Sequence, residues 1–249
     1  MNAANKYANI GYSEFRRLAN DSDLSKYERI GFPDSYREGY EESIFDDIRI
    51  KLTNLNDNNR LILDIGPGCS DLPVMMIDHC RVHKHQLHLI DSDEMLAQLP
   101  DESFITKTAA LYPNCPDTIE ALRGNVDVIL CYSVLHYILI DTAFFRFLDT
   151  SLSLLAPGGQ MLIGDIPNIS KRKRFFASDS GVRFHQEFMK TDERPLVQFN
   201  TIELDQIDDA IVFSLLLRAR SQGFEAYVLP QATNLPMANR REDILITCP

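Results

Sequence analysis

A turn containing two glycines is the feature of this 249-residue sequence with the clearest chemical potential. Residues 64–70 read Asp-Ile-Gly-Pro-Gly-Cys-Ser and connect a short apolar run, 61–65, to a segment of helical character, 71–82. Gly66 and Gly68 allow the backbone to turn tightly and to approach a ligand without side-chain obstruction. A simple structural bend would also use glycines here, so the turn alone does not indicate a binding site.

Asp91 supplies a second, independent feature. It ends the next apolar run, 86–91, and follows Gly68 by 23 residues. The carboxyl ends of neighbouring parallel strands meet at one edge of an open α/β sheet, where ligands bind. A carboxylate there can accept hydrogen bonds from both ribose hydroxyls of a nucleoside, although Asp91 could instead cap a helix. A dinucleotide-binding turn usually carries a third glycine where this chain has Asp71, which disfavours a pyrophosphate ligand.

Alternating strands and helices would position these residues. The pattern predicts strands at 61–65, 86–91, 103–108, 126–132, 160–165, 224–229 and 243–248. It predicts helices at 35–55, capped by Asp34 or Ser35, and at 71–82, 93–99, 116–122, 142–155 (ended by Pro157-Gly158-Gly159) and 205–222. Such alternation is typical of a doubly wound α/β fold with a mostly parallel sheet. We expect 103–108 at an edge and the last two strands antiparallel, and we predict no strand or helix for the basic, aromatic segment 170–189.

No linker-like composition divides the chain, so we predict a single domain over 1–249. Within it, 1–58 would form an N-terminal helical lid, 59–168 the cofactor-binding core, and 169–249 an acceptor-side insertion with the final strands. The lid prediction depends on a group of aromatic residues that could equally belong to the core. They are Tyr7, Tyr12, Phe15, Tyr27, Phe32 and Tyr36.

The composition favours a soluble, cytoplasmic protein. The formal net charge is −11, which disfavours nonspecific binding to nucleic acids. We find no signal-peptide pattern and no apolar run near the roughly 18 residues that span a bilayer. The five cysteines are odd in number and irregularly spaced, so we expect reduced thiols. The sequence does not indicate an oligomeric state.

Histidines crowd one stretch of the chain, at His79, His83, His85 and His88, beside Cys80. Such a cluster could suggest a metal site. However, the stretch leads from a predicted helix into a predicted strand. We therefore expect its side chains to point in different directions, and we predict no bound metal.

Four segments resemble, in the same order, motifs of class I S-adenosylmethionine-dependent methyltransferases. They read LILDIGPGCSDL, LHLIDSDEML, VDVILCYSVLHYI and LLAPGGQMLIGD, and together they span 61–165. The resemblance implies a Rossmann-like sheet of seven strands with an antiparallel last strand. It also implies S-adenosyl-L-methionine as the cofactor.

The resemblance assigns roles to eight residues of this chain. Asp64, Gly66 and Gly68 would line the methionine part of the cofactor, and Asp91 would hold the ribose, with Ser92 close by. Cys131 and Tyr132 would lie beneath the sulfonium, and Ala109 near the adenine. Members of the family often carry an acidic or polar residue at the adenine position, so Ala109 departs from their pattern.

A methyl transfer requires mainly that an acceptor atom be held in line with the sulfonium methyl group. A base is needed only if the acceptor loses a proton. The candidates are His136, just past the fourth predicted strand, Asp165, at the end of the fifth, and His185. Alternatively, His136 could pack against the following helix, and Asp165 could cap a turn.

A basic tract, 171–174, follows the fifth predicted strand of this acidic protein. Arg172, Arg174 and Arg183, with Tyr137, are the predicted acceptor-binding residues. Guanidinium groups on the acceptor rim would favour a small phosphate- or sugar-nucleotide-bearing molecule, although a solvated charged face is the simpler interpretation. Segment 31–39 resembles methyltransferases encoded beside bacterial surface-polysaccharide genes, which agrees with an anionic acceptor.

Two other functional classes stay open. One is an oxidoreductase that binds a nucleoside cofactor on a similar sheet. The other is a noncatalytic scaffold protein that keeps the cofactor-binding fold. The Asn-Pro-Pro-Tyr signature of amino-methylating nucleic-acid enzymes is absent, because the fourth predicted strand ends in Cys131-Tyr132-Ser133-Val134. RNA or protein stays open as an acceptor, but the absence disfavours a nucleic acid, and we predict a small-molecule acceptor.

Overall fold

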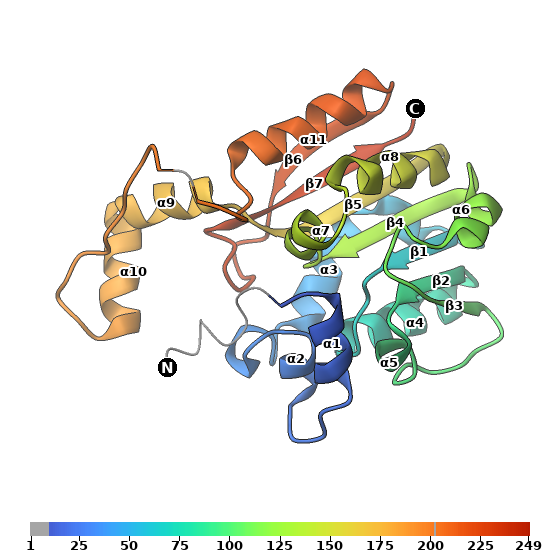
Figure 1. Cartoon of the computed structure of the whole chain (residues 1–249), viewed down its shortest axis with the longest axis horizontal. Helices are drawn as coiled ribbons and strands as arrows, with labels where there is room; N and C mark the ends of the chain where they lie inside the picture. Colours follow the sequence, from blue (N-terminus) through green and yellow to red (C-terminus); the bar gives the residue numbers. More distant parts are fainter. Residues whose placement is uncertain (1–9, 202) are drawn as a thin grey trace.

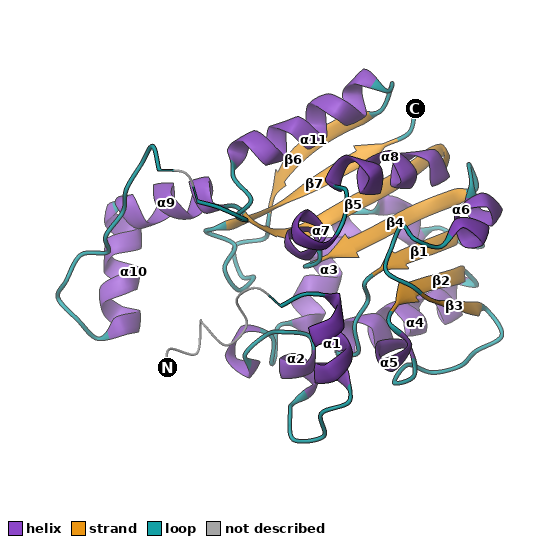
Figure 2. Cartoon of the chain, viewed as in Figure 1, coloured by secondary structure: helices purple, strands orange, loops and turns teal. Residues whose placement is uncertain are grey.

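The computed structural model describes residues 10–201 and 203–249, and its centre is a seven-stranded sheet (Figures 1 and 2). The strands are β1 (Leu61–Ile65), β2 (Gln86–Asp91), β3 (Ile105–Ala109), β4 (Val126–Tyr132), β5 (Leu155–Pro167), β6 (Glu225–Pro230) and β7 (Arg241–Thr247). Their order is β3-β2-β1-β4-β5-β7-β6. The first five run parallel, and β7 lies antiparallel to both β5 and β6. The fold class, the edge position of β3 and the antiparallel final pair are confirmed.

Helices cover both faces of the sheet (Figure 2). They are α1 (Tyr12–Ala19), α2 (Lys26–Arg29), α3 (Glu41–Lys51), α4 (Asp71–His83), α5 (Asp93–Leu96), α6 (Pro116–Leu122), α7 (Leu135–Asp141), α8 (Phe144–Leu154), α9 (Ile169–Ala177), α10 (Asp179–Met189) and α11 (Asp209–Ser221), with short 3₁₀ turns η2 (Asp34–Tyr36) and η3 (Thr53–Asn56). None of the helices in the described ranges is long and apolar enough to cross a membrane.

Alternate residues of the central strands pack into two separate core layers. Leu63 and Ile65 of β1 join the layer that contains Phe147 of α8, whereas Ile62 joins the layer that contains Ile48 of α3. This alternation follows from the two-residue period of a strand. The central strands are apolar on both faces because helices cover both faces.

The helix predicted at 35–55 is shorter than expected. A 3₁₀ turn, Asp34–Tyr36, is followed by Gly39 with φ +79°, and α3 begins only at Glu41. A left-handed residue cannot continue a right-handed helix, so Gly39 separates the two elements. The predicted caps are therefore wrong: the residue preceding α3 is Tyr40, and Asp34 instead accepts a hydrogen bond from the Ser25 hydroxyl.

The helix predicted at 142–155 is confirmed as α8, but a separate helix that was not predicted, α7, precedes it. α7 ends at Asp141, Thr142 is extended, and α8 begins at Phe144. Residues 157–159, which were expected to end that helix, lie within β5 instead. A Cβ at Gly159 would lie 2.9 Å from the Val126 carbonyl oxygen, so glycine is needed for this close strand contact.

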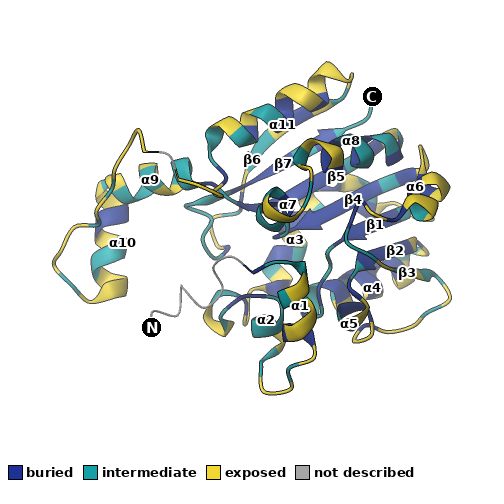
Figure 3. Ribbon diagram, in the orientation of Figure 1, coloured by how far each residue is buried: buried dark blue, intermediate teal, exposed yellow. Residues whose placement is uncertain are grey.

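Residues 170–189 fold into two helices for which the sequence analysis predicted no element. Asn168 caps α9 through the Ser170 and Lys171 amides, and Ser178 caps α10 through the Gly181 amide. The pair projects away from the sheet as an arm (Figure 1), and most of its residues are half-buried or exposed (Figure 3). We call residues 168–208 the arm, and residues 10–37 the cap.

Candidate functional site

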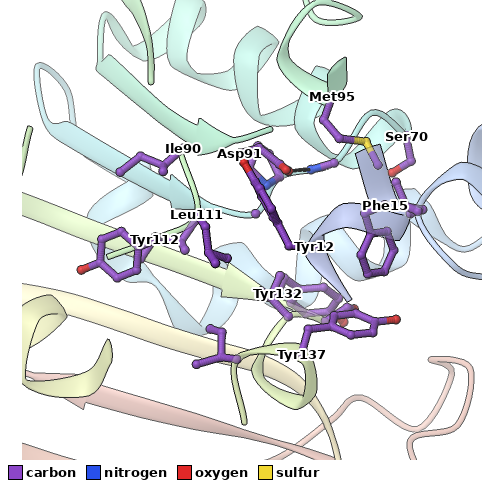
Figure 4. Close-up of a pocket in the computed structure, with 18 of the residues that line it drawn as sticks. Tyr12, Phe15, Ser70, Ile90, Asp91, Met95, Leu111, Tyr112, Tyr132 and Tyr137 are labelled. Carbon is purple, nitrogen blue, oxygen red and sulfur yellow. Dashed lines mark hydrogen bonds between the residues drawn. The ribbon is translucent and has the colours of Figure 1, made fainter. Parts of the chain in front are cut away.

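A cavity of about 940 Å³, partly open to solvent, lies at the carboxyl ends of β1, β2 and β4 (Figure 4). Its floor is formed by the glycine turn, Asp91 and Tyr132, and segment 110–112 after β3 closes one side. The cap contributes Tyr12, Phe15, Ile30, Phe32 and Arg37, and the region around α7 contributes Val134, Tyr137, Ile138 and Asp141. The position agrees with the strand-end location expected for ligands in α/β sheets.

The two glycines of the turn are required by backbone conformation and by close packing. Gly66 and Gly68 have φ of +71° and +68°. A Cβ at Gly66 would lie 2.8 Å from Val134 Cγ2, and one at Gly68 would lie 2.7 Å from Ile30 Cγ2. A side chain at either position would therefore be strained and would displace a cavity wall.

Asp91 is held rigidly at the cavity floor. Its two carboxylate oxygens accept hydrogen bonds from the backbone amides of Gly68, at 2.9 Å, and Ser92, at 2.6 Å. Burial raises the pKa of Asp91 to about 6, even though both amide contacts act in the opposite direction. Each carboxylate oxygen has further acceptor capacity for the hydroxyl groups of a ligand.

Asp64 adds a carboxyl group next to the turn, and this one is buried. It is 4% exposed, and burial, followed by repulsion from Asp91, raises its pKa to about 8. Neither group has a cationic side chain bonded to it among the described residues. A buried carboxyl and a half-buried one, both without a counter-charge, indicate a site suited to a ligand that carries positive charge.

Arg37 is the one cationic side chain among the described residues that line the cavity. It is 4% exposed, and its Nη2 donates to Ser133 Oγ at 2.5 Å and lies 3.4 Å from Asp165 Oδ2. The guanidinium also lies 4.3 Å from the Phe32 ring centroid. These contacts hold a positive group at a defined place in the wall.

Aromatic residues of the cap line one side of the cavity. Phe15 packs edge-on against Tyr137 with ring centroids 4.6 Å apart. Figure 4 shows the Tyr12 side chain crossing the cavity between Asp91 and Tyr132. Tyr27 is buried elsewhere, with its hydroxyl 3.2 Å from Asp71. Of the other aromatic residues predicted for the lid, Phe32 lines the cavity, Tyr36 does not, and Tyr7 lies outside the described residues.

The structure brings four of the eight predicted cofactor residues to the cavity wall: Gly66, Gly68, Asp91 and Tyr132. Asp64 and Cys131 are buried in strands, and Ser92 caps α5. Ala109 is exposed, whereas its neighbour Ala110 lines the cavity. The adenine-side prediction was therefore one residue away from the wall, because β3 extends through Ala109 and the chain turns inward only afterwards.

The three predicted catalytic residues do not line the cavity. His136 lies on α7, where burial and then Arg241 lower its pKa to about 3. For Asp165, burial would raise the pKa, but Arg241 and Arg37 outweigh it and the net pKa is lowered. Asp165 also accepts hydrogen bonds from Ser133 and Gln231. His185 lies on α10 against Phe176.

The predicted acceptor-binding residues lie in two separate parts of the structure. Tyr137 lines the cavity, whereas Arg172, Arg174 and Arg183 lie on the arm. Arg174 pairs with Asp209 at 2.5 Å, and the other two guanidinium groups are exposed. Residues that follow β5 were expected to lie on the rim of the cavity. Instead, β5 continues to Pro167 and α9 leads the chain away from it.

Sequence reasoning did not identify Arg37, Ser133 or the 110–112 segment as parts of the site. An arginine inside an aromatic stretch, as in Phe32-Pro33-Asp34-Ser35-Tyr36-Arg37, was the available signal for Arg37. Nothing local indicates its partners, since Ser133 and Asp165 are 96 and 128 residues away.

The expectation that the clustered histidines point apart is wrong for three of them. Nitrogen atoms of His79, His83 and His85 all lie within 4.8 Å of one another. The left-handed Lys84, φ +57°, reverses the chain at the end of α4 and returns His85 beside the helix. His88 does point elsewhere, toward Thr108 Oγ1 at 3.0 Å.

Among the comparisons with known proteins, only the one with solved structures finds matches. No protein-family profile matches the sequence, and no curated protein matches it. The fold resembles the CurJ carbon methyltransferase (TM-score 0.57, 15% identity), covering 95% of this chain and 64% of that one. It also resembles the plantazolicin methyltransferase BpumL, solved with SAH and a monoazolic desmethylPZN analog (TM-score 0.57, 14% identity, 99% of both chains).

A third match is the N-methyltransferase NodS from Bradyrhizobium japonicum WM9, solved with S-adenosyl-L-homocysteine. Its TM-score is 0.52 at 14% identity, with 96% of this chain and 98% of that chain covered. Identities this low establish the architecture and not the activity. Strand order, the antiparallel β7 and these matches together show that the chain has the Rossmann-like methyltransferase fold.

Proposed function

We propose that this protein is an S-adenosylmethionine-dependent methyltransferase that binds its cofactor in the cavity at the carboxyl ends of β1, β2 and β4. One observation carries the proposal. The Gly66–Gly68 turn is hydrogen-bonded to a half-buried Asp91 at the place where a nucleoside would lie. The three structural matches described above are all methyltransferases, and they support the same activity.

The charges and shape of the wall fit this cofactor. Asp91 would accept hydrogen bonds from the ribose hydroxyls, and Asp64, buried at the end of β1 beside the glycine turn, would lie on the side of the cofactor's ammonium group. Arg37 would pair with the carboxylate of the methionine part. The Tyr12 and Tyr132 rings would face the sulfonium, which aromatic faces attract. A zwitterionic, cationic ligand therefore meets complementary charges.

When bound, the cofactor supplies an electrophilic methyl group, and the protein's own task is to position the acceptor. Neither His136 nor Asp165 is placed to accept a proton from a ligand in the cavity. Burial raises the pKa of Tyr137 to about 12, so its hydroxyl stays protonated and can orient an acceptor by hydrogen bonding. The proposed mechanism relies on orientation and on the exclusion of water by the cap.

We further propose that the acceptor is a small anionic molecule, in keeping with the resemblance of 31–39 to surface-polysaccharide-associated enzymes. Arg172 and Arg183 have exposed guanidinium groups that can meet phosphate or carboxylate groups at a distance from the methyl group. Arg174 contributes less, because it is already paired with Asp209.

Calorimetry with S-adenosylhomocysteine tests the cofactor proposal. We expect saturable binding at one site per chain, and no binding of NAD under the same conditions. Transfer of a labelled methyl group from S-adenosylmethionine to phosphorylated sugars would then identify the acceptor. Preferential binding of NAD would favour the oxidoreductase, and cofactor binding without transfer to any acceptor class would favour a scaffold protein.

A further inference from the structure

We propose that His79, His83 and His85 form a binding site for a divalent transition-metal ion such as Zn²⁺, at the edge of the sheet opposite the cofactor cavity. His79 and His83 are one helical turn apart on α4, and His85 immediately precedes β2. Their ring centroids are 4.3, 5.5 and 6.0 Å apart, and their candidate ligand atoms lie within 4.8 Å of one another.

Backbone carbonyl groups orient two of these rings as they do in metal sites. His79 Nε2 lies 2.7 Å from the Leu55 carbonyl oxygen, and His83 Nδ1 lies 2.8 Å from the Asp57 carbonyl oxygen. A carbonyl only accepts, so these nitrogens carry the protons. The lone pairs are then on His79 Nδ1 and His83 Nε2, and neither atom has a hydrogen bond within residues 10–201 and 203–249. Metal-binding histidines usually donate their second ring nitrogen to a carbonyl or carboxylate in this way.

His85 can supply a third ligand, but it then has to give up a hydrogen bond. Its Nε2 donates to the same Leu55 carbonyl, at 3.1 Å, so its lone pair is on Nδ1, which accepts the Arg60 amide at 3.0 Å. A metal ion at Nδ1 would replace that amide bond. His79 and His83 therefore supply the primary ligand pair, and His85 the third ligand.

The donor set determines the class of ion. Imidazole nitrogens favour Zn²⁺, Cu²⁺, Ni²⁺ and Co²⁺ over Mg²⁺ and Ca²⁺, which prefer oxygen. Zn–N bonds of about 2.0–2.1 Å place two nitrogens of a tetrahedral site about 3.3 Å apart, so nitrogens that lie within 4.8 Å of one another have to approach by at most about 1.5 Å. His83 is half-buried, so its ring can move, and a water molecule can complete the coordination.

The location indicates a structural role. His85 and Asp91 are at opposite ends of β2, which at about 3.3 Å per residue places the site about 20 Å from the cavity floor. A bound ion would link the end of α4, the start of β2 and the connection that carries Leu55 and Asp57. The inference is therefore independent of the proposed methyltransferase activity.

Tag-free protein stripped with a chelator tests the site. Calorimetry with Zn²⁺ should show one saturable site per chain, and Co²⁺ should give a visible absorption band. Zn²⁺ should also raise the melting temperature of the stripped protein, because it binds the folded state.

His83→Gln should weaken Zn²⁺ binding at least tenfold and remove the Co²⁺ band, with His79→Gln as the second test of the pair. His88→Gln, which changes a neighbouring histidine bonded to Thr108, should leave both signals intact. Circular dichroism would show that each variant is folded. Absence of saturable Zn²⁺ binding to the unmodified chain, or equal affinity in the His83→Gln protein, would overturn the proposal.

Discussion

The cap and the arm are two additions to the same sheet, but they have opposite relations to the cavity. The cap precedes the first strand in the chain, yet it contributes aromatic side chains and the cation Arg37 to the cavity wall. The arm directly follows β5, a central strand, yet none of its described residues reaches the cavity. Position next to a central strand in the sequence therefore does not establish proximity to a binding site.

Their contacts explain the difference. The cap is attached along its length: Arg16 pairs with Glu94 at 2.8 Å, and the Tyr12 amide donates to Asp141 at 2.9 Å. The arm is held mainly at its base, where Asn168 donates to Glu242 at 2.6 Å. Farther out, Phe188 is 64% exposed. The direction in which a helix leaves its strand, and the contacts it finds there, decide which addition shapes the site.

Asp91→Ala should have the largest effect on the cavity side of this comparison. It removes the carboxylate that is expected to bind both ribose hydroxyls, and charge-assisted hydrogen bonds contribute about 1.5–3 kcal/mol each. We expect the Kd for S-adenosylhomocysteine, measured by calorimetry, to rise on the order of 100-fold. Asp192→Ala, an exposed carboxylate of the arm, should leave it within about twofold. Equal increases in Kd for the two variants would contradict the distinction between the cavity and the arm.

Gly68→Ala should weaken binding about tenfold, because the new Cβ would push Ile30 of the cap outward in addition to straining the turn. Gly124 is a matched control, since it has the same φ of +68° and no atom within 4 Å of an added Cβ. Gly124→Ala should lower the free energy of unfolding by about 1–2 kcal/mol without changing the Kd. If Gly68→Ala and Gly124→Ala had a similar Kd, the position of the cap would not depend on the contact between Gly68 and Ile30.

Asp64→Asn tests whether the Asp64 carboxyl beneath the cap is protonated in the folded protein. Folding raises the pKa of Asp64 from 3.8 to about 8, so the folded state favours the protonated carboxyl. The stability it contributes is present below about pH 4 and is lost as the pH rises toward 8. Without cofactor, Asp64→Asn should therefore gain stability relative to the unmodified protein between pH 5 and pH 8, by at most about 1.4 kcal/mol per pH unit. Urea denaturation at several pH values measures this difference, and a difference constant with pH would contradict it.

The arm should give the smallest effects on the cofactor. Arg172→Ala combined with Arg183→Ala should change the Kd for S-adenosylhomocysteine less than twofold, because neither side chain lines the cavity. If the acceptor is anionic, as proposed, its KM should rise severalfold while kcat is retained. An unchanged acceptor KM would remove the arm from acceptor binding, and a large change in cofactor affinity would show that the arm reaches the cavity in solution.

The local features of this protein could be predicted from its sequence. The strands β1, β2 and β4 were predicted at their observed bounds, because residues buried between two helical layers form short continuous apolar runs. The glycine turn and Asp91 were predicted together, because parallel strand ends meet at one edge. Two glycines separated by one residue, and an acidic residue at the end of a strand, are local signals that need no knowledge of distant contacts.

Tertiary structure alone decided the rest. Arg37 reaches the wall by bonding to residues about a hundred positions away, and no local period indicates such a pairing. His85 joins His79 and His83 only because a single left-handed residue, Lys84, reverses the chain between them. The arm leaves the rim because β5 runs past Asp165 to Pro167 before α9 begins. In each case the outcome depends on the direction of the backbone and on long-range contacts, whereas sequence patterns report which residues are buried and how often they recur.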